Sequence, residues 1–242
     1  MNVRHLPIVV GHQGSSEGVA PGSLDAYRVA LNAGAEMVEV DVRGTSDGCF
    51  LALHDSHVQG RPIRSQSMTE LQEALGSAIV TLRQVCGLVA DAGRMLMVDL
   101  KDIGREIETM ESVLDVLDPR QFVVSTLEDV SVSRLRRSRP ELEVGLSLGR
   151  DRPRPLLRTR LSEVLPLRRA RAADARFLSV NWKLARVGVL RQAARAGLPV
   201  YLWTVDDDSA LRDHLGDSRL RGVITNRPQR ALELRLEYGR LA

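Results

Sequence analysis

The residues best suited to chemistry are carboxylates that stand where short apolar runs end. Glu39 and Asp41 lie in the run MVEVDVR, and Asp99 lies near the end of the run MLMVDL. Residues two apart on a strand point to the same side, so we expect Glu39 and Asp41 to face one space. Three carboxylates brought together repel one another unless a cation neutralises them. Oxygen ligands favour one divalent cation, Mg²⁺ or Ca²⁺, with Mn²⁺ also suitable, whereas zinc is less favoured without a His or Cys ligand.

Two histidines and a lysine add the groups that a hydrolytic site needs. His12 follows the apolar run IVVG, and His54 follows LAL. Imidazole titrates near neutral pH, so the pair could act as general base and general acid, while a structural role is the alternative for each histidine taken alone. Lys101 could hold a phosphate oxygen as a compact positive charge, or it could instead pair with Asp99 or Glu39. This set of groups predicts cleavage of a phosphate ester.

The elements that must position these residues alternate between strand-like and helix-like patterns. Nine apolar runs resemble strands, at 8–11, 37–42, 50–54, 95–100, 122–127, 144–148, 177–182, 200–205 and 222–225. Segments with helical periodicity lie between most of them, at 23–32, 81–92, 106–117, 130–138, 184–196, 209–215 and 228–238. Apolar strands separated by helices predict a parallel sheet covered on both faces.

Closure of this sheet into a (β/α)8 barrel best explains how distant residues could meet. In an open sheet of sequential strand order, the first and eighth strands would lie roughly 30 Å apart. In a closed barrel the carboxyl ends of all strands face one mouth, where catalytic residues gather. His12, Glu39, Asp41 and Asp99 stand at such ends, and Trp203 stands at another. We therefore predict an α/β fold of the TIM-barrel type.

Nine runs are one too many for eight strands. The segment 44–48, GTSDG, is too short for a helical crossover of about a dozen residues. Asp47-Gly48 predicts a tight turn, which would make the third run a hairpin arm. One alternative is that the chain returns through an unusual short connection, and another is that the last run lies outside the barrel. The sequence leaves these possibilities open.

Composition limits the classes of function and partner. The 34 basic and 31 acidic residues give a net charge of +3, too small an imbalance to indicate nucleic-acid binding. No apolar stretch approaches the ~20 residues of a membrane span, and no signal peptide is visible, so we expect a cytoplasmic protein. The length of 242 residues predicts that residues 1–242 form a single domain, because α/β barrels often run to about 200–250 residues as one unit. The arginine- and proline-rich segment 150–171 predicts a solvated loop and helix. Its alternative role is a basic surface that makes weak contact with an anionic membrane.

Ordered motifs along the chain resemble those of the glycerophosphodiester phosphodiesterase family, from residue 8 to about residue 230. In the first half of the chain, the counterparts are HQG (12–14) for the family's H-R-G, PGSL (21–24) for P-E-N-T, EVDV (39–42) for E-L-D-V, TSDG (45–48) for T-x-D-G, HD (54–55) for H-D and DLK (99–101) for E-x-K. Near the C-terminal end, they are VYLWTVD (200–206) for V-x-x-W-T-V-N and GVITNRP (222–228) for G-I-I-T-D-x-P. Each motif is weak alone, but the ordered set is specific.

The resemblance implies a (β/α)8 barrel of the phospholipase-C-like phosphodiesterase type. It also implies metal-dependent hydrolysis of glycerophosphodiesters to glycerol 3-phosphate and an alcohol. Site roles follow for catalytic His12 and His54, for metal ligands Glu39, Asp41 and Asp99, and for substrate contacts Lys101, Gln13 and Trp203. These roles are implied by the resemblance and are expectations at this point.

Three departures from the motifs keep alternatives open. Gln13 replaces the family arginine and so loses a bidentate phosphate contact, Gly22 replaces the P-E-N-T glutamate, and Asp99 replaces a longer glutamate. One alternative is a catalytically silent barrel that binds phosphorylated ligands. Another is an enzyme of altered substrate that releases a cyclic phosphate.

Overall fold

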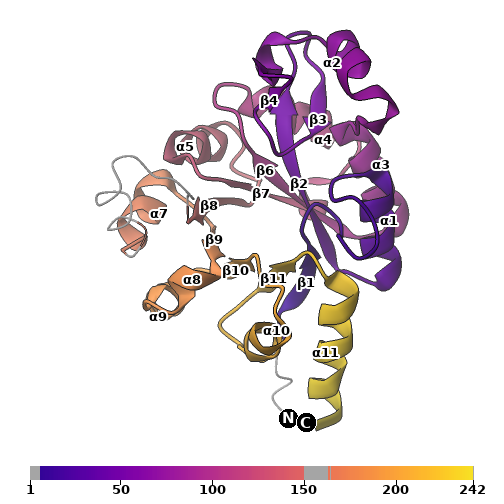
Figure 1. The fold of residues 1–242 in the computed structure, drawn as a ribbon. Helices are drawn as coiled ribbons and strands as arrows, with labels where there is room; N and C mark the ends of the chain where they lie inside the picture. Colours follow the sequence, from indigo (N-terminus) through magenta and orange to yellow (C-terminus); the bar gives the residue numbers. More distant parts are fainter. Residues whose placement is uncertain (1–5, 150–162, 164, 242) are drawn as a thin grey trace.

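A closed barrel of eight parallel strands forms the centre of the protein (Figure 1). The computed structural model describes residues 6–149, 163 and 165–241. The barrel strands are β1 (Ile8–Gly11), β2 (Met37–Gly44), β6 (Met95–Leu100), β7 (Phe122–Thr126), β8 (Val144–Leu148), β9 (Phe177–Asn181), β10 (Val200–Trp203) and β11 (Gly222–Thr225). Strand β1 pairs in parallel with both β2 and β11, which closes the barrel and confirms the predicted fold class.

The third of the nine apolar runs is a hairpin arm. Strand β3 (Phe50–Ala52) pairs antiparallel with the end of β2, with Gly44 opposite Phe50. Asp47 stabilises the turn, since its carboxylate accepts hydrogen bonds from the Thr45 hydroxyl at 2.6 Å and from the Met68 backbone. The hairpin prediction is confirmed. The alternative of a last run outside the barrel is wrong, because β11 pairs with both β1 and β10 inside the barrel.

A small excursion follows the hairpin and was not predicted. It contains β4 (His57–Val58), β5 (Arg61–Pro62), the short helices η1 (Ile63–Ser65) and η2 (Gly76–Ala78), and α2 (Met68–Leu75). A local core of Leu51, Val58, Ile63 and Leu71 holds it together. Elements this short lack the length over which hydrophobic periodicity is readable.

Helices cover the outside of the barrel, in the order expected. They are α1 (Leu24–Ala33), α3 (Leu82–Ala92), α4 (Glu106–Leu114), α5 (Asp129–Ser138), α7 (Leu167–Ala173), α8 (Trp182–Ala185), α9 (Val189–Arg195), α10 (Asp208–Leu215) and α11 (Pro228–Leu241), with the single turn η3 (Pro119–Gln121) before β7. The helix predicted over 184–196 is instead divided into α8 and α9. Gly188 has φ 89 at this division, a left-handed conformation that interrupts a helix.

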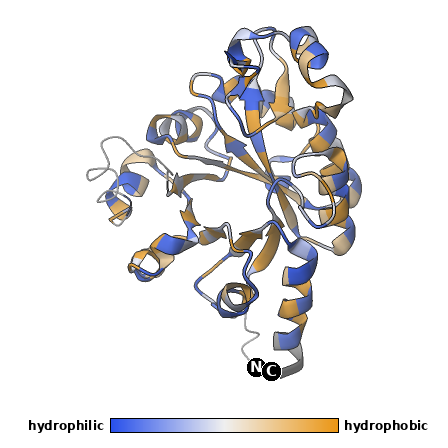
Figure 2. Cartoon of the chain, viewed as in Figure 1, coloured by the Kyte–Doolittle hydropathy of each residue, from blue (hydrophilic) through white to orange (hydrophobic). Residues whose placement is uncertain are grey.

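Two apolar layers follow from the alternation of side chains along each strand. One face of each strand packs against the helices, and the other fills the barrel with Val10, Met37, Met97, Val123, Phe177, Tyr201 and Ile224. In Figure 2 the barrel strands are mostly coloured as hydrophobic, while the helices carry both colours. Gly145 leaves room for this filling, since a Cβ there would lie 2.3 Å from the Phe177 ring. The apolar side chains inside the barrel lie below the polar residues at its mouth.

Among the helices of the described residues, none has both the length and the apolar character needed to span a bilayer.

Candidate active site

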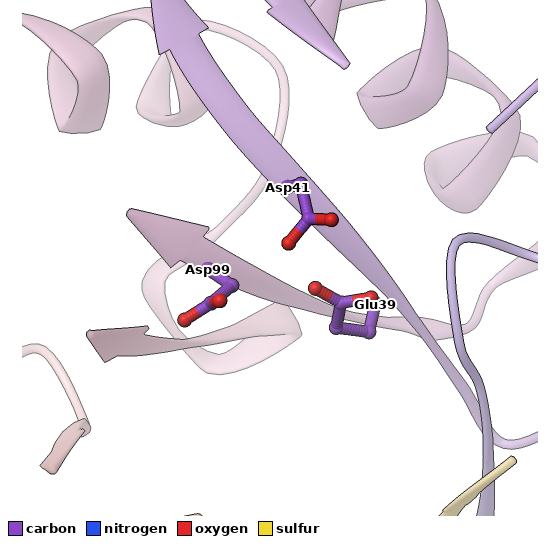
Figure 3. A group of neighbouring side chains, drawn as sticks. All are labelled: Glu39, Asp41 and Asp99. Atoms are coloured by element: carbon purple, nitrogen blue, oxygen red, sulfur yellow. The ribbon is translucent and has the colours of Figure 1, made fainter. Parts of the chain in front are cut away.

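Three carboxylates converge at the mouth of the barrel (Figure 3). Glu39 and Asp41 project from β2, and Asp99 stands opposite Asp41 in the register of β2 with β6. Each offers an oxygen that lies within 4.8 Å of an oxygen of the others. The predicted E-x-D pair and the aspartate from a separate strand therefore share one space.

Burial gives this cluster a strong preference for added positive charge. Glu39 is 4% exposed, and burial raises its pKa well above the ordinary value, with Asp41 and Asp99 raising it further. Burial alone would raise the pKa of Asp41, but Lys101 outweighs that effect and lowers it. Three carboxylates face one ammonium, so an excess of negative charge remains. All-oxygen donors with this charge fit Mg²⁺, Ca²⁺ or Mn²⁺.

Lys101 lies between two of the carboxylates. Its Nζ is 2.7 Å from Asp41 Oδ1 and also forms an ion pair with Asp99. Burial alone would lower the pKa of Lys101, but the surrounding carboxylates raise it above its usual value. The lysine is therefore charged, and both the phosphate contact and the pairing with Asp99 considered for it remain compatible with its position.

Gln13 contacts two of the metal-ligand candidates directly. Its backbone N–H donates to Glu39 Oε2 at 3.0 Å, and its side-chain Nε2 donates to Asp41 Oδ2 at 2.7 Å. The left-handed φ of 47 at Gln13 turns the backbone toward these carboxylates. Gln13 is not among the residues that line the pocket, and the substrate contact expected of it stays a prediction.

His12 is held by a chain of hydrogen bonds from the other end of the sequence. Its Nδ1 lies 2.8 Å from Asn226 Oδ1, and Asn226 Nδ2 donates to Asp206 Oδ2 at 2.7 Å. Asp206 also accepts from the Asn226 backbone at 2.8 Å. Because the Asn226 amide nitrogen donates to Asp206, the Asn226 oxygen accepts from His12 Nδ1. The other ring nitrogen, Nε2, lies 3.9 Å from Glu39 Oε2.

His54 occupies the outer lip of the same pocket. Its side chain is 65% exposed, with Nδ1 3.1 Å from Asp55 Oδ1. Its backbone oxygen accepts from Arg43 Nε at 2.9 Å, which fixes the segment that follows β3. The two predicted catalytic histidines thus lie in one pocket, one deep and bonded, the other open to solvent.

The pocket has a volume of about 140 Å³. Its lining residues are His12, Glu39, Asp41, His54, Met97, Asp99, Lys101, Ser125, Leu127, Ser147, Gly149, Ser179, Trp203 and Ile224. Every predicted site residue except Gln13 belongs to this set.

Several site residues were missed from the sequence. Ser125, Ser147 and Ser179 line the pocket, and Ser125 Oγ donates to Asp99 Oδ1 at 2.7 Å. A readable signal existed, since each serine alternates with apolar residues on a predicted strand and so faces the barrel interior. Asn226 and Asp206 lay in motifs that were recognised, but no local pattern assigns them a partner.

The segment 150–171 lies largely outside the described residues. Within it, Glu163 is buried, and its Oε1 accepts from the Gly149 backbone N–H at 3.0 Å. The surface and membrane roles considered for this segment stay predictions.

Comparison with known proteins agrees with this arrangement. The model of the glycerophosphoryl diester phosphodiesterase family matches residues 12–230. The glycerophosphodiester phosphodiesterase GDPD4 of Arabidopsis thaliana is 28% identical, and the alignment covers 93% of this chain and 72% of that protein.

Solved structures agree in fold. A glycerophosphoryl diester phosphodiesterase described as putative from Agrobacterium tumefaciens superposes with a TM-score of 0.83 at 19% identity, covering 98% of this chain and 100% of that one. An Oleispira antarctica phosphodiesterase in complex with the product sn-glycerol-3-phosphate gives a TM-score of 0.75 at 22% identity, covering 95% of this chain and 96% of that one. Since the family model spans most of the chain, the protein belongs to the glycerophosphoryl diester phosphodiesterase family and is an enzyme of that class.

Proposed function

We propose that this enzyme hydrolyses glycerophosphodiesters to glycerol 3-phosphate and an alcohol with the help of one divalent cation. The observation that carries the proposal is the meeting of a buried carboxylate cluster with His12, whose Nε2 lies 3.9 Å from Glu39 Oε2 in the same pocket. A relative of the same fold binds sn-glycerol-3-phosphate as its product, which supports the choice of product.

Glu39, Asp41 and Asp99 would hold Mg²⁺ or Ca²⁺, with Mn²⁺ as a further candidate. When bound, the ion supplies neutralisation of the charge on the phosphoryl oxygens. Lys101, which is charged and lines the same pocket, would donate to a nonbridging phosphate oxygen. Gln13 would keep Asp41 oriented for this task, as hydrogen-bond partners of metal ligands commonly do.

The histidines would divide the proton transfers. His12 Nε2 would accept the proton of the glycerol hydroxyl next to the phosphate, and that oxygen would attack phosphorus. His54 would give a proton to the departing alcohol oxygen, for which its exposed position at the lip is suitable. Water would then open the cyclic phosphodiester to give glycerol 3-phosphate.

Hydrolysis of glycerophosphocholine by the purified protein tests this proposal. We expect choline release with Mg²⁺ or Ca²⁺, its loss in EDTA, and a decrease of about 10²–10⁴-fold in His12→Ala. Turnover that neither EDTA nor the variant reduces would exclude the mechanism.

Two other outcomes have distinct signatures. Phosphorus NMR would identify a cyclic phosphate as the final product if water does not complete the reaction. The second candidate is the silent barrel, because Gln13 stands where the family arginine would contact phosphate, and its side-chain amide instead donates to Asp41. Calorimetry showing tight binding of glycerol 3-phosphate, without turnover under any of the three ions, would support that candidate.

The cytoplasmic location and the single-domain organisation of residues 1–242 stay predictions. Cell fractionation tests the first. Limited proteolysis tests the second, because a single folded domain should resist cleavage between its barrel strands. Thermal unfolding should also show one cooperative transition.

A further inference from the structure

One side of the pocket presents hydroxyl groups that have no protein partner. Ser147 on β8 and Ser179 on β9 stand opposite each other in the strand register. They are 5% and 3% exposed, and both line the pocket. Among the described residues, neither hydroxyl has a hydrogen-bond partner, whereas that of Ser125 donates to Asp99. We call Ser147 and Ser179 the serine wall.

Trp203 extends the wall onto the next strand. It closes β10, which pairs with β9, and its indole lines the pocket. Its Nε1 is buried and has no hydrogen-bond partner within the part of the chain that the structure describes. Buried donors without a partner are rare in folded proteins because their desolvation is not compensated. The two serine hydroxyls thus face a space that only a ligand or solvent can fill, whereas the indole N–H of Trp203 is buried against the apolar filling of the barrel.

The chemistry of this wall differs from that of the opposite side. Serine hydroxyls both donate and accept, so the wall suits neutral groups that do both. It contains no carboxylate and no cation, which makes it unsuited to a charged head group. The remaining lining near it is apolar, with Met97, Leu127 and Ile224. A short polyol has this combination of hydroxyl groups and carbon chain.

We propose that the serine wall, with Trp203 beside it as a lining residue, forms a subsite for the free terminal hydroxyl of the glycerol group. This inference rests on the proposed function, in which His12 engages the neighbouring glycerol hydroxyl. The wall thus makes the enzyme selective for the glycerol half of the substrate. The leaving alcohol departs beside His54, whose side chain is 65% exposed. The enzyme therefore accepts a wider range of leaving alcohols than of groups on the glycerol side.

A pair of substrates that differ by one hydroxyl tests the subsite. Glycerophosphocholine is compared with its analogue built on propane-1,2-diol, which keeps the attacking hydroxyl and the choline leaving group but lacks the terminal hydroxyl. We expect the protein to prefer the glycerol substrate by at least about tenfold in kcat/KM, because the analogue leaves the wall unpaired. In Ser147→Ala/Ser179→Ala that preference should fall below about threefold.

Ser138→Ala is the matched control. Ser138 is an exposed serine at the end of α5, and its removal should leave the preference unchanged. A preference that the double variant retains in full overturns the proposal, as does a protein that cleaves both substrates equally well. Circular dichroism and the melting temperature verify that the double variant is folded, and the two single variants provide the same comparison with smaller changes.

A binding experiment separates failure of the subsite from failure of the proposed reaction. Calorimetry compares glycerol 3-phosphate with propane-1,2-diol phosphate, and it needs no turnover. Tighter binding of glycerol 3-phosphate that disappears in the double variant supports the wall even if no diester is cleaved. Equal affinity for the two ligands overturns it even if hydrolysis proceeds.

Fluorescence tests the third member of the subsite. The chain has two tryptophans, so Trp182→Phe leaves Trp203 as the single reporter. We expect its emission maximum to shift on addition of glycerol 3-phosphate and not on addition of inorganic phosphate. An identical response to both ligands would remove Trp203 from the subsite.

Discussion

The two sides of the pocket differ in how their polar groups are bonded. On the carboxylate side, formed by β1, β2 and β6, each functional group already has protein partners. Asp41 contacts Lys101 and Gln13, and His12 contacts Asn226. On the serine wall, by contrast, the hydroxyls have no partner among the described residues.

This difference indicates two kinds of task. Groups that stabilise developing charge act best when fixed beforehand, because they then need no reorganisation during the reaction. Groups that recognise a neutral hydroxyl must keep their hydrogen-bonding capacity available for the ligand. The first side is therefore expected to control the rate, and the second to control the choice of substrate.

The largest effect should come from the centre of the carboxylate side. Asp41→Asn removes a candidate metal ligand and a partner of Lys101, so we expect kcat/KM for glycerophosphocholine to fall by at least about 10³-fold. Asp25→Asn is the control, because Asp25 is an exposed residue of α1 paired with Arg28. Initial rates over a titration of Mg²⁺ measure the effect. Near-parental rates in the Asp41 variant at low Mg²⁺ would contradict the metal role.

A smaller effect should follow when the hydrogen-bonded chain that orients the His12 ring is broken. Asp206→Ala removes the acceptor that orients Asn226, and we expect kcat to fall by about 10- to 100-fold with little change in KM. Asp206→Asn keeps an acceptor oxygen and should recover part of the rate.

The adjacent Asp207 provides the control for this variant. Its side chain accepts from the backbones of Ser209 and Ala210 and caps α10. Asp207→Ala should therefore lower the free energy of unfolding by about 1 kcal/mol and leave kcat unchanged. Equal losses of kcat in the two alanine variants would show that Asp206 acts on stability and not on His12.

The smallest effect concerns Gln13, which donates a hydrogen bond to Asp41. Gln13→Ala removes the hydrogen bond to Asp41 Oδ2, and we expect the Mg²⁺ concentration for half-maximal activity to rise about tenfold. The kcat at saturating Mg²⁺ should change little. Gln229→Ala, at an exposed position on α11, is the control. A variant that instead raises KM for the substrate at saturating Mg²⁺ would return Gln13 to the substrate-contact role expected from the sequence.

Much of the fold was predictable because the strands and helices are long enough to show periodicity. The short segment before β3 also excluded a helical crossover, which left a hairpin as one of the possibilities. The prediction failed where local signals were weak. The apolar spacing over 184–196 predicted one continuous helix, but Gly188 divides this segment into α8 and α9. The excursion around α2 was not predicted because its elements have only a few residues each. The serine wall was missed because a lone serine on a strand has no chemical signature of its own.

The amino-acid sequence by itself determined which side chains face the barrel interior, since alternation along a strand is a property of the local backbone. It also determined that carboxylates, imidazoles and a lysine stand at strand ends. Only the tertiary structure decided their partners. Asn226 reaches His12 across 214 residues because β11 closes the barrel beside β1, and Gln13 reaches Asp41 because the backbone turns after β1. Hydrogen bonds depend on positions to within a few tenths of an ångström, and no pattern of residue types along the chain specifies those positions.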